Sequence, residues 1–335
     1  MKAYRLFEWQ KPARLVDVDI PEPGPGEVRI KVAGNGICGS DLHLMHDWKE
    51  SPKHINIELP MTIGHEVGGY IDKLGLGVQG LTVGKPALVT IAGCGQCSFC
   101  AQGFNQYCMN KGKQTGMGLD GGLAEYAIAP AGGIVEVDNF DPIATAPLTD
   151  AGLSSYHAVK RILPLLKPGS VVGIIGVGGL GHLAIQEIKA ISAAKVVAFV
   201  LGENEVEFAK ENGADEVRIS SIENVDPLSF EAFIDFVGIR ATMELAAKAI
   251  KPLGHIVIVG RGKDGIEFKD RALPYGAMMS TTFGGTRAEL MELIELAKSG
   301  YIKPRITRYK LSDIEKAFDD LNNGRIKGRG VVVPD

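Results

Sequence analysis

Four of the five cysteines lie within residues 94–108 and have the spacing of a metal site, Cys94-x2-Cys97-x2-Cys100-x7-Cys108. Thiolates at this spacing form a closed tetrahedral zinc site, which stabilises the fold and takes no part in catalysis. A disulfide cluster is the alternative, but it would leave Cys38 as an odd fifth cysteine, and no secretory segment opens the chain. We therefore predict a structural zinc in the loop 94–108.

A second group of chemically able side chains occurs earlier in the chain. The segment 36–43, Gly-Ile-Cys-Gly-Ser-Asp-Leu-His, contains a thiol, a hydroxyl, a carboxyl and an imidazole, and His65-Glu66 follows it. A thiolate, an imidazole and carboxylates are the ligand types of a catalytic zinc, which has three protein ligands and one open position. Taken singly, Cys38 is more simply explained as a small buried hydrophobic residue and His65 as an ordinary polar group. They are candidates as a set.

A third motif is a glycine-rich segment in the second half of the chain. The apolar run Val171–Ile175 is followed by Gly-Val-Gly-Gly-Leu-Gly and then by an apolar stripe with helical spacing. In this order the glycines permit a tight turn and a close approach of a pyrophosphate to a helix N-terminus. A merely structural turn is the alternative, which the strand–turn–helix context disfavours. The expected cofactor-binding residues are Gly176, Gly178, Gly179, Leu180 and Gly181.

The dinucleotide fingerprint departs from its usual form at the end of the next predicted strand, Val196–Leu201. An acidic residue is expected there to bind the adenosine ribose, but the sequence has Val200, with Glu203 three residues later. Glu203 can supply this carboxylate if the loop curls back. No Lys or Arg between Lys195 and Lys210 is available for a ribose 2′-phosphate, so we predict NAD rather than NADP.

The length of the chain and its pattern of predicted strands and helices indicate two domains. A chain of 335 residues exceeds the usual size of one hydrophobic core. Up to about Tyr126 the pattern is of short strands broken by turn residues, as in the alternating segment Val28–Val32. From about Pro147 strands alternate with helices, which predicts a parallel sheet with crossover helices and an α/β fold class.

Bulk properties exclude several classes of function. The net charge is −4, from 36 basic and 40 acidic residues, so the chain lacks the excess of positive charge expected of a protein that binds nucleic acid. No window of eighteen apolar residues is present, so no membrane-spanning helix is expected. Reduced cysteines and the absence of a signal peptide predict a cytoplasmic protein.

In their order along the chain, these four motifs resemble those of the zinc-dependent medium-chain alcohol dehydrogenases, and the resemblance covers essentially the whole chain. It implies a β-rich, GroES-like catalytic domain at 1–147, a doubly wound Rossmann domain that binds NAD at 148–285, and a C-terminal segment, 286–335, that returns to the first domain. It also implies two zinc ions per chain, hydride transfer between an alcohol and NAD, and a homo-oligomer, either tetramer or dimer.

The resemblance assigns Cys38 and His65 as ligands of the catalytic zinc. It places the third ligand at Asp150, in the stretch Pro-Leu-Thr-Asp-Ala, where many relatives have a cysteine; by itself Asp150 would be explained as a helix N-cap. Glu66 is expected beside the metal, as an exchangeable fourth ligand or as a neighbour. Asp41 matches the carboxylate that orients the ligating histidine.

Ser40 and His43 match a proton relay that leads from the alcohol through Ser40, the nicotinamide ribose and His43 to solvent. Such a relay is needed because zinc lowers the pKa of a bound alcohol as it does that of water. An ordinary surface histidine is the alternative explanation of His43. Arg329 is expected to contact the pyrophosphate. Val259, at the end of the predicted strand His255–Val259, is expected to be a further cofactor contact.

Two other functions remain open at this stage. A polyol or sugar-alcohol dehydrogenase of the same superfamily is the closer one, although such relatives commonly take their metal carboxylate from another place. A non-catalytic relative of the fold is the second, but it would have lost ligands that are all present here. The residues expected near the substrate are apolar or compact, which favours bulky or secondary alcohols: Trp48, Thr90, Met117 and Leu119.

Overall fold

The computed structural model describes residues 1–52, 57–110, 112–267, 269 and 271–335. The chain forms two compact units. The first contains 1–150, 285–294 and 304–335, and the second contains 151–284 and 295–303. Within the predicted C-terminal segment, residues 295–303 are therefore grouped with the second unit. The domain limits 1–147, 148–285 and 286–335 stay a prediction.

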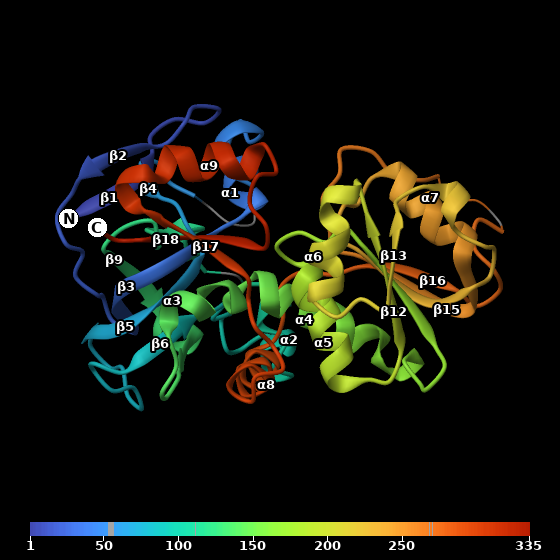
Figure 1. Cartoon of the computed structure of the whole chain (residues 1–335). Helices are drawn as coiled ribbons and strands as arrows, with labels where there is room; N and C mark the ends of the chain where they lie inside the picture. Colours follow the sequence, from blue (N-terminus) through green and yellow to red (C-terminus); the bar gives the residue numbers. More distant parts are fainter. Residues whose placement is uncertain (53–56, 111, 268, 270) are drawn as a thin grey trace. The chain divides into compact units, whose positions relative to one another are not determined.

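The first unit is built mainly of strands (Figure 1). A seven-stranded sheet has the order β10-β6-β5-β3-β18-β17, with β9 also paired to β3. A three-stranded sheet has the order β2-β1-β4, and β7 pairs with β8. The elements are β1 Lys2–Leu6, β2 Arg14–Asp17, β3 Glu27–Ile37, α1 Gly39–His46, β4 Met61–Thr62, β5 Glu66–Leu74, β6 Pro86–Val89, α2 Ser98–Ala101, β7 Gln114–Thr115, β8 Gly118–Leu119, β9 Tyr126–Pro130, β10 Ile134–Glu136, α3 Pro142–Thr145, β17 Ile306–Lys310, α9 Ile314–Asn322 and β18 Arg329–Val333.

Strand β3 shows why this half forms a sheet with one buried face. Val28, Ile30 and Val32 are buried in a common apolar cluster, whereas Arg29 between them is paired with Asp72 through Nε at 2.6 Å. This alternation is the one expected of a half-buried antiparallel strand. The C-terminal strand β18 pairs antiparallel with β3, with Gly330 opposite Ile37. Segments from the N-terminal and C-terminal parts of the chain therefore lie in one sheet.

The second unit contains a six-stranded, wholly parallel sheet with the order β13-β12-β11-β14-β15-β16. This is the doubly wound order of dinucleotide-binding folds, which confirms the predicted fold class. Helix α8, Arg287–Lys298, begins in the first unit and ends in the second. The other elements are α4 Ala151–Ile162, β11 Val171–Ile175, α5 Gly181–Ile191, β12 Lys195–Val200, α6 Val206–Glu211, β13 Glu216–Ile219, β14 Phe230–Asp235, α7 Arg240–Ala249, β15 Ile250–Ile258 and β16 Met278–Thr281.

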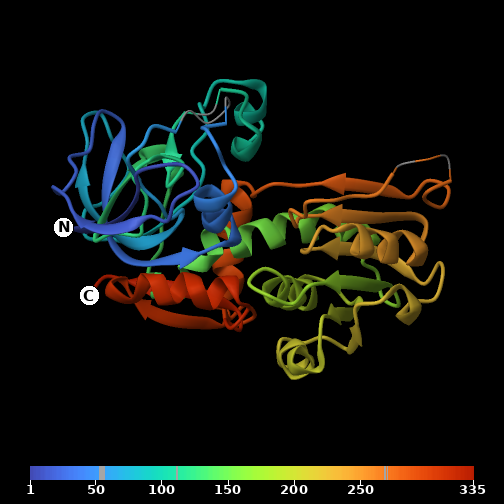
Figure 2. The same ribbon diagram turned by 90° about the horizontal axis from the view of Figure 1, so that it is seen from above.

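Both faces of this parallel sheet are covered by helices (Figures 1 and 2). Val196, Ala198 and Val200 of β12 pack in a cluster that includes side chains of α4, α5 and α6. Val197 and Phe199, which alternate with them, pack in a cluster that includes side chains of α7. Burial on both faces explains why these strands are nearly continuous apolar runs in the sequence. In the part of the chain that the structure describes, no helix is long and apolar enough to cross a membrane.

Candidate active site

The predicted ligands of the catalytic zinc come together in the first unit. The nearest ligand atoms of Cys38, His65, Glu66 and Asp150 all lie within 4.8 Å of one another. Pairing of β3 with β5, with Gly36 opposite Glu66, brings Cys38 and His65 to the same end of the sheet. Asp150 arrives from the 3₁₀ turn Ala146–Thr149, which packs on the same strands.

The distances fit a tetrahedral zinc. One oxygen of Asp150, Oδ2, lies 3.7 Å from Cys38 Sγ and 3.5 Å from His65 Nε2. Ordinary zinc bond lengths and tetrahedral angles require roughly 3.6 Å for a sulfur–oxygen pair and roughly 3.4 Å for a nitrogen–oxygen pair. The donor set and its spacing therefore fit the metal, with Cys38, His65 and Asp150 as ligands.

His65 is oriented by a carboxylate on its far side. Its Nδ1 lies 3.1 Å from Asp41 Oδ1, while Asp41 Oδ2 accepts a hydrogen bond from the backbone N–H of Cys38 at 2.9 Å. Asp41 is fully buried on the first turn of α1. Burial alone would lower the pKa of His65, but Asp41 and Asp150 hold it well above the ordinary value. With Nδ1 turned to Asp41, Nε2 of His65 faces Asp150, which is the arrangement expected of a ligating histidine oriented by a carboxylate.

Next to the candidate ligands lies a buried ion pair between Arg329, near the C-terminus, and Glu66 of β5. Arg329, at the start of β18, is bidentate to Glu66, with Nε 3.0 Å from Oε2, and its Nη2 lies 3.6 Å from Asp150 Oδ2. Burial raises the pKa of Glu66 to about 7 against the opposing effect of Arg329. A Cβ at Gly36 would lie 1.8 Å from Glu66 Oε2, so this position requires glycine. The structure pairs Arg329 with Glu66, and a contact of Arg329 with the pyrophosphate stays a prediction.

The neighbouring His65 and Arg329 also determine the pKa of Asp150. Burial would raise its pKa, but the hydrogen bond and charge of His65, together with the charge of Arg329, lower it below its usual range. The carboxylate is thereby held in the ionised form that a metal ligand needs.

Helix α1 leads from the metal ligands toward solvent. Ser40 Oγ lies 3.7 Å from Cys38 Sγ, and His43 follows one turn later. The side chain of His43 is 41 % exposed, and its Nδ1 lies 2.5 Å from Asp47 Oδ2. The order of residues matches the predicted relay, but the pairing of His43 with Asp47 was not foreseen. Its signal in the sequence is the i, i+4 spacing.

The four-cysteine loop is a second, separate cluster in the first unit. All four Sγ atoms lie within 4.8 Å of one another, and Cys97 Sγ is 3.9 Å from Cys108 Sγ, close to the roughly 3.8 Å expected across a tetrahedral zinc. Backbone N–H groups of Cys94 and Cys97 point to Cys108 Sγ and Cys94 Sγ, both at 3.3 Å. All five cysteines are free thiols, so the disulfide cluster considered as an alternative is not formed.

Hydrogen bonding and burial shift the pKa values of the cluster's thiols in opposite directions. Backbone N–H donors lower the pKa of Cys97 to about 6, whereas burial raises that of Cys108 to about 11. Gly93 has φ of +67°, and a Cβ there would meet Cys100 Sγ at 2.7 Å, so the loop closes around the sulfurs only with glycine. The cluster fits a structural zinc.

The glycine turn of the second unit has the form that a dinucleotide requires. Gly176 has φ of +85°, and a Cβ on Gly181 would lie 2.0 Å from the carbonyl oxygen of Gly176. A Cβ on Gly178 would meet nothing within 4 Å, so that position is open. Gly179 and Leu180 lead into α5, whose N-terminal N–H groups favour an anion. The turn therefore fits a pyrophosphate.

The structure places the other predicted cofactor residues around the same sheet. Val200, at the end of β12, is fully buried. Glu203 is exposed and starts the 3₁₀ turn Glu203–Glu205 directly beyond this strand. Val259 follows β15, and its N–H donates to the carbonyl of Asp235 at 2.9 Å. Roles for Glu203 and Val259 in binding the cofactor stay predictions.

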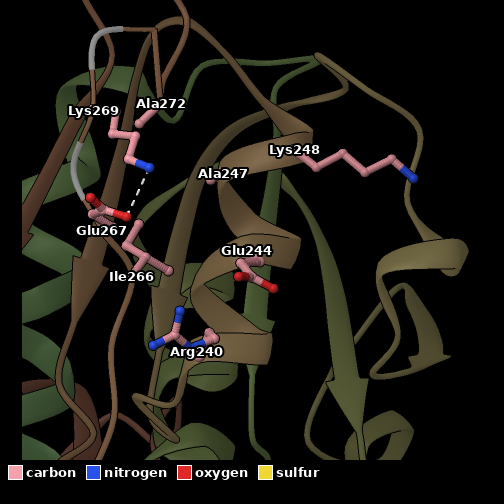
Figure 3. A pocket seen from close by; sticks show the side chains of 8 residues that line it. All are labelled: Arg240, Glu244, Ala247, Lys248, Ile266, Glu267, Lys269 and Ala272. Atoms are coloured by element: carbon pink, nitrogen blue, oxygen red, sulfur yellow. Dashed lines mark ion pairs between the residues drawn. The ribbon is translucent and has the colours of Figure 1, made fainter.

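A pocket on the second unit lies away from these residues (Figure 3). Its lining comes from α7 and the segment after β15, with Arg240, Glu244 and Lys248 on the helix and an ion pair between Lys269 and Glu267 at 2.9 Å. It contains none of the glycines of the turn and none of the metal-ligand candidates.

Comparisons with known proteins agree with the geometry. The family described as "Alcohol dehydrogenase GroES-like domain" matches residues 24–139, and that described as "Zinc-binding dehydrogenase" matches residues 179–299. A relative from Saccharolobus solfataricus named "NAD-dependent alcohol dehydrogenase" is 31% identical, with 100% of each chain covered.

Two solved structures are similar over their whole length. The alcohol dehydrogenase of Aeropyrum pernix has a TM-score of 0.92 at 33% identity, with 100% of each chain covered. The acetophenone reductase of Geotrichum candidum, solved in complex with NAD, has a TM-score of 0.88 at 31% identity, and the match covers 99% of this chain and 96% of that one.

The fold and the two metal clusters define a two-domain zinc oxidoreductase. The chain belongs to the zinc-type medium-chain alcohol dehydrogenase family.

Proposed function

We infer that the protein is an enzyme that interconverts an alcohol and an aldehyde or ketone with NAD as the hydride carrier. The observation that carries this is the constellation of Cys38, His65 and Asp150, with Asp41 behind His65, in a chain that also contains the glycine turn. When bound, zinc supplies a Lewis acid and NAD supplies the hydride acceptor.

The side chains of this chain do the remaining work. Cys38, His65 and Asp150 hold the metal, and three protein ligands leave one position for the substrate oxygen. Ser40, 3.7 Å from Cys38 Sγ, would accept the hydroxyl proton of a substrate beside the metal while it gives up its own hydrogen toward His43. His43, one turn further along α1 and partly exposed, would pass a proton on to solvent.

The test is the oxidation of a panel of primary, secondary and polyhydroxy alcohols with NAD and with NADP. We expect activity on simple alcohols, zinc in the purified protein and higher kcat/KM with NAD. The acetophenone reductase is named for a bulky aromatic ketone, which supports including secondary aromatic alcohols. Turnover of polyols alone would favour the sugar-alcohol alternative, and no turnover in a zinc-loaded protein would contradict the proposal.

Preference for NAD is proposed to depend on Glu203. Val200 offers no acceptor for ribose hydroxyls, whereas the carboxylate of Glu203, just beyond the same strand, can bind them and repels a 2′-phosphate. We expect Glu203→Ala to lower the NAD/NADP ratio of kcat/KM about tenfold, since roughly 1–2 kcal/mol is at stake in such contacts. Glu207→Ala, at an exposed acid of α6, is the matched control, and an unchanged ratio in Glu203→Ala would refute this role.

We also propose a cytoplasmic homo-oligomer, either a dimer or a tetramer. Free thiols in a zinc-type cluster support a reducing compartment. The family resemblance supports oligomerisation. Sedimentation of the zinc-loaded protein would reveal the mass, and a monomer at micromolar concentration would contradict the oligomer.

A further inference from the structure

The strongest unassigned feature lies at the end of α1, where Asp47 folds its carboxylate back onto His43. Oδ2 of Asp47 lies 2.5 Å from Nδ1 of His43. Both side chains are about equally exposed, at 40% and 41%. Nothing in the proposed reaction yet uses Asp47.

The pairing fixes the tautomer of His43. An ionised carboxylate only accepts hydrogen bonds, so Nδ1 of the imidazole must carry the hydrogen. Nε2 is then the nitrogen with a free electron pair. An imidazole that carries its hydrogen on the side facing a carboxylate accepts a proton at its other nitrogen.

Helix stability does not explain an acid at this position. Asp47 is the C-terminal cap of α1, and its backbone N–H already donates to the carbonyl of His43 at 2.9 Å. A negative side chain at a helix C-terminus is disfavoured by the helix dipole. An exposed ion pair contributes little to stability. The contact of this carboxylate with Nδ1 of His43 is the one that bears on the proposed reaction.

The path along α1 also runs from buried to exposed groups. Cys38 is 8% exposed and Ser40 is half-buried, whereas the side chains of His43 and Asp47 are about two-fifths exposed. A proton released beside the metal ligands thus meets groups of increasing contact with water.

We propose that Asp47 is a positioning residue of the proton relay, which holds His43 in the Nδ1–H tautomer so that Nε2 exchanges the substrate proton with solvent. This rests on the proposed function of Ser40 and His43. In oxidation the alcohol carbon loses a hydride to NAD, and the hydroxyl loses a proton. The proton adds to Nε2 of His43, and the imidazolium then returns a proton to water. Asp47 is not consumed and does not touch the substrate.

The direct test is the ¹⁵N spectrum of histidine-labelled, zinc-loaded protein, with the His43 signals assigned from their loss in His43→Gln. In the wild type we expect the Nδ1–H tautomer of neutral His43, and in Asp47→Asn a shift toward the Nε2–H form. Because this measurement needs no turnover, it stands even if the substrate is not found. The same mixture of tautomers in both proteins would overturn the proposal.

The kinetic test uses Asp47→Asn, His43→Gln and the double variant, with Glu50→Gln as the matched change of a nearby exposed acid. We expect Asp47→Asn to lower kcat about tenfold with little change in KM, and His43→Gln to lower it about a hundredfold. The double variant should equal His43→Gln, because Asp47 acts only through the imidazole. Added imidazole buffer should restore part of the rate in Asp47→Asn, which a merely structural defect would not allow.

The failures are distinguishable. If the wild type oxidises no alcohol, the proposed function fails. If the wild type is active and Asp47→Asn matches Glu50→Gln in kcat, or if Asp47→Asn lowers the rate further in the His43→Gln background, this inference fails while the function stands.

Discussion

One carboxylate oxygen of Asp150 faces a thiol, an imidazole and a guanidinium. Oδ2 lies 3.7 Å from Cys38 Sγ, 3.5 Å from His65 Nε2 and 3.6 Å from Arg329 Nη2. This geometry is that of a monodentate metal ligand with its charge balanced by a buried guanidinium. Removing the charge therefore removes a ligand and unbalances Arg329 as well.

We expect Asp150→Asn to lose the catalytic zinc and at least about a hundredfold in kcat/KM, since loss of even an outer partner of a metal site costs 10–100-fold. Asp150→Cys is the matched control, because a thiolate is also a good zinc ligand, and it should retain the metal and part of the activity. The measurements are zinc content by atomic absorption and alcohol oxidation. Full zinc content and full activity in Asp150→Asn would show that Asp150 is not a ligand.

Residue types made Cys38 and His65 candidates as a set, because the ligand chemistry of zinc restricts the choice to a few side chains, and the family resemblance added Asp150 and Glu66. These were not sufficient to predict the pairs around the metal site. Arg329 and Glu66 are 263 positions apart in sequence and meet only because β18 pairs with β3. Asp47 was missed for the opposite reason, since a local i, i+4 pair on a short helix is common on any surface.

At the scale of elements, the contact between α4 and α5 contains an unusual buried acid. Glu187 of α5 is fully buried, its Oε1 lies 2.9 Å from Ser155 Oγ of α4, and its Oε2 has no hydrogen-bond partner. Ser155 also lies 2.9 Å from the carbonyls of Ala151 and Gly152. A hydroxyl has one proton to give, so a protonated Glu187 can donate to Ser155 while Ser155 donates to its own helix. Burial accordingly raises the pKa of Glu187 well above its usual 4.5.

This acid makes stability depend on pH. With a raised pKa in the folded state, the folded chain keeps a proton that the unfolded chain loses above pH 4.5. Its contribution to stability is complete below that value and is lost as the pH rises through the folded pKa, by up to about 1.4 kcal/mol per pH unit.

We expect Glu187→Met to remove this part of the pH dependence and to raise the free energy of unfolding at pH 8 by on the order of 1–3 kcal/mol. The loss of the carboxyl group costs little, because the hydroxyl of Ser155 still donates to the carbonyls of its own helix. Glu187→Gln is the control, since it keeps a donor to Ser155 but cannot titrate. The measurement is urea unfolding between pH 5 and pH 8.5, read as the difference from the wild type. Parallel curves for the wild type and both variants would show that Glu187 is ionised in the folded protein.

Elements with strong periodicity were predicted well. The strand Val171–Ile175 was placed to the residue, and the predicted helices at 241–250 and 289–299 differ from α7 and α8 by one or two residues. Helices α1 and α4 were not predicted as helices. Helix α1 has only eight residues, four of them polar (Ser40, Asp41, His43 and His46), so it shows no simple apolar stripe. In α4 ten of the twelve residues are buried, and polar residues such as Ser155 and His157 are among them, so its buried face is not purely apolar in the sequence.

At the scale of the whole molecule, the chain contains two metal clusters with different consequences for folding. The catalytic cluster gathers ligands from β3, β5 and the turn before α4, which the sheet already holds in place. The cluster at 94–108 lies in a loop whose regular structure is limited to α2 and one short 3₁₀ turn. That loop has little else to hold it, so its metal supplies folding free energy.

We therefore expect two zinc ions per chain with separable roles. Cys38→Ala should retain about one zinc, lose nearly all activity and keep its thermal midpoint, since a small buried thiol is replaced by a small apolar group. Cys100→Ala should also retain about one zinc, but its midpoint should fall by roughly 5–10 °C, the shift that several kcal/mol produces in a chain of this size. Zinc analysis and calorimetry of the three proteins, with and without a mild chelator, provide the comparison. One zinc in the wild type, or an unchanged midpoint in Cys100→Ala, would contradict the structural role, because the loop would then fold without a metal held by its four thiolates.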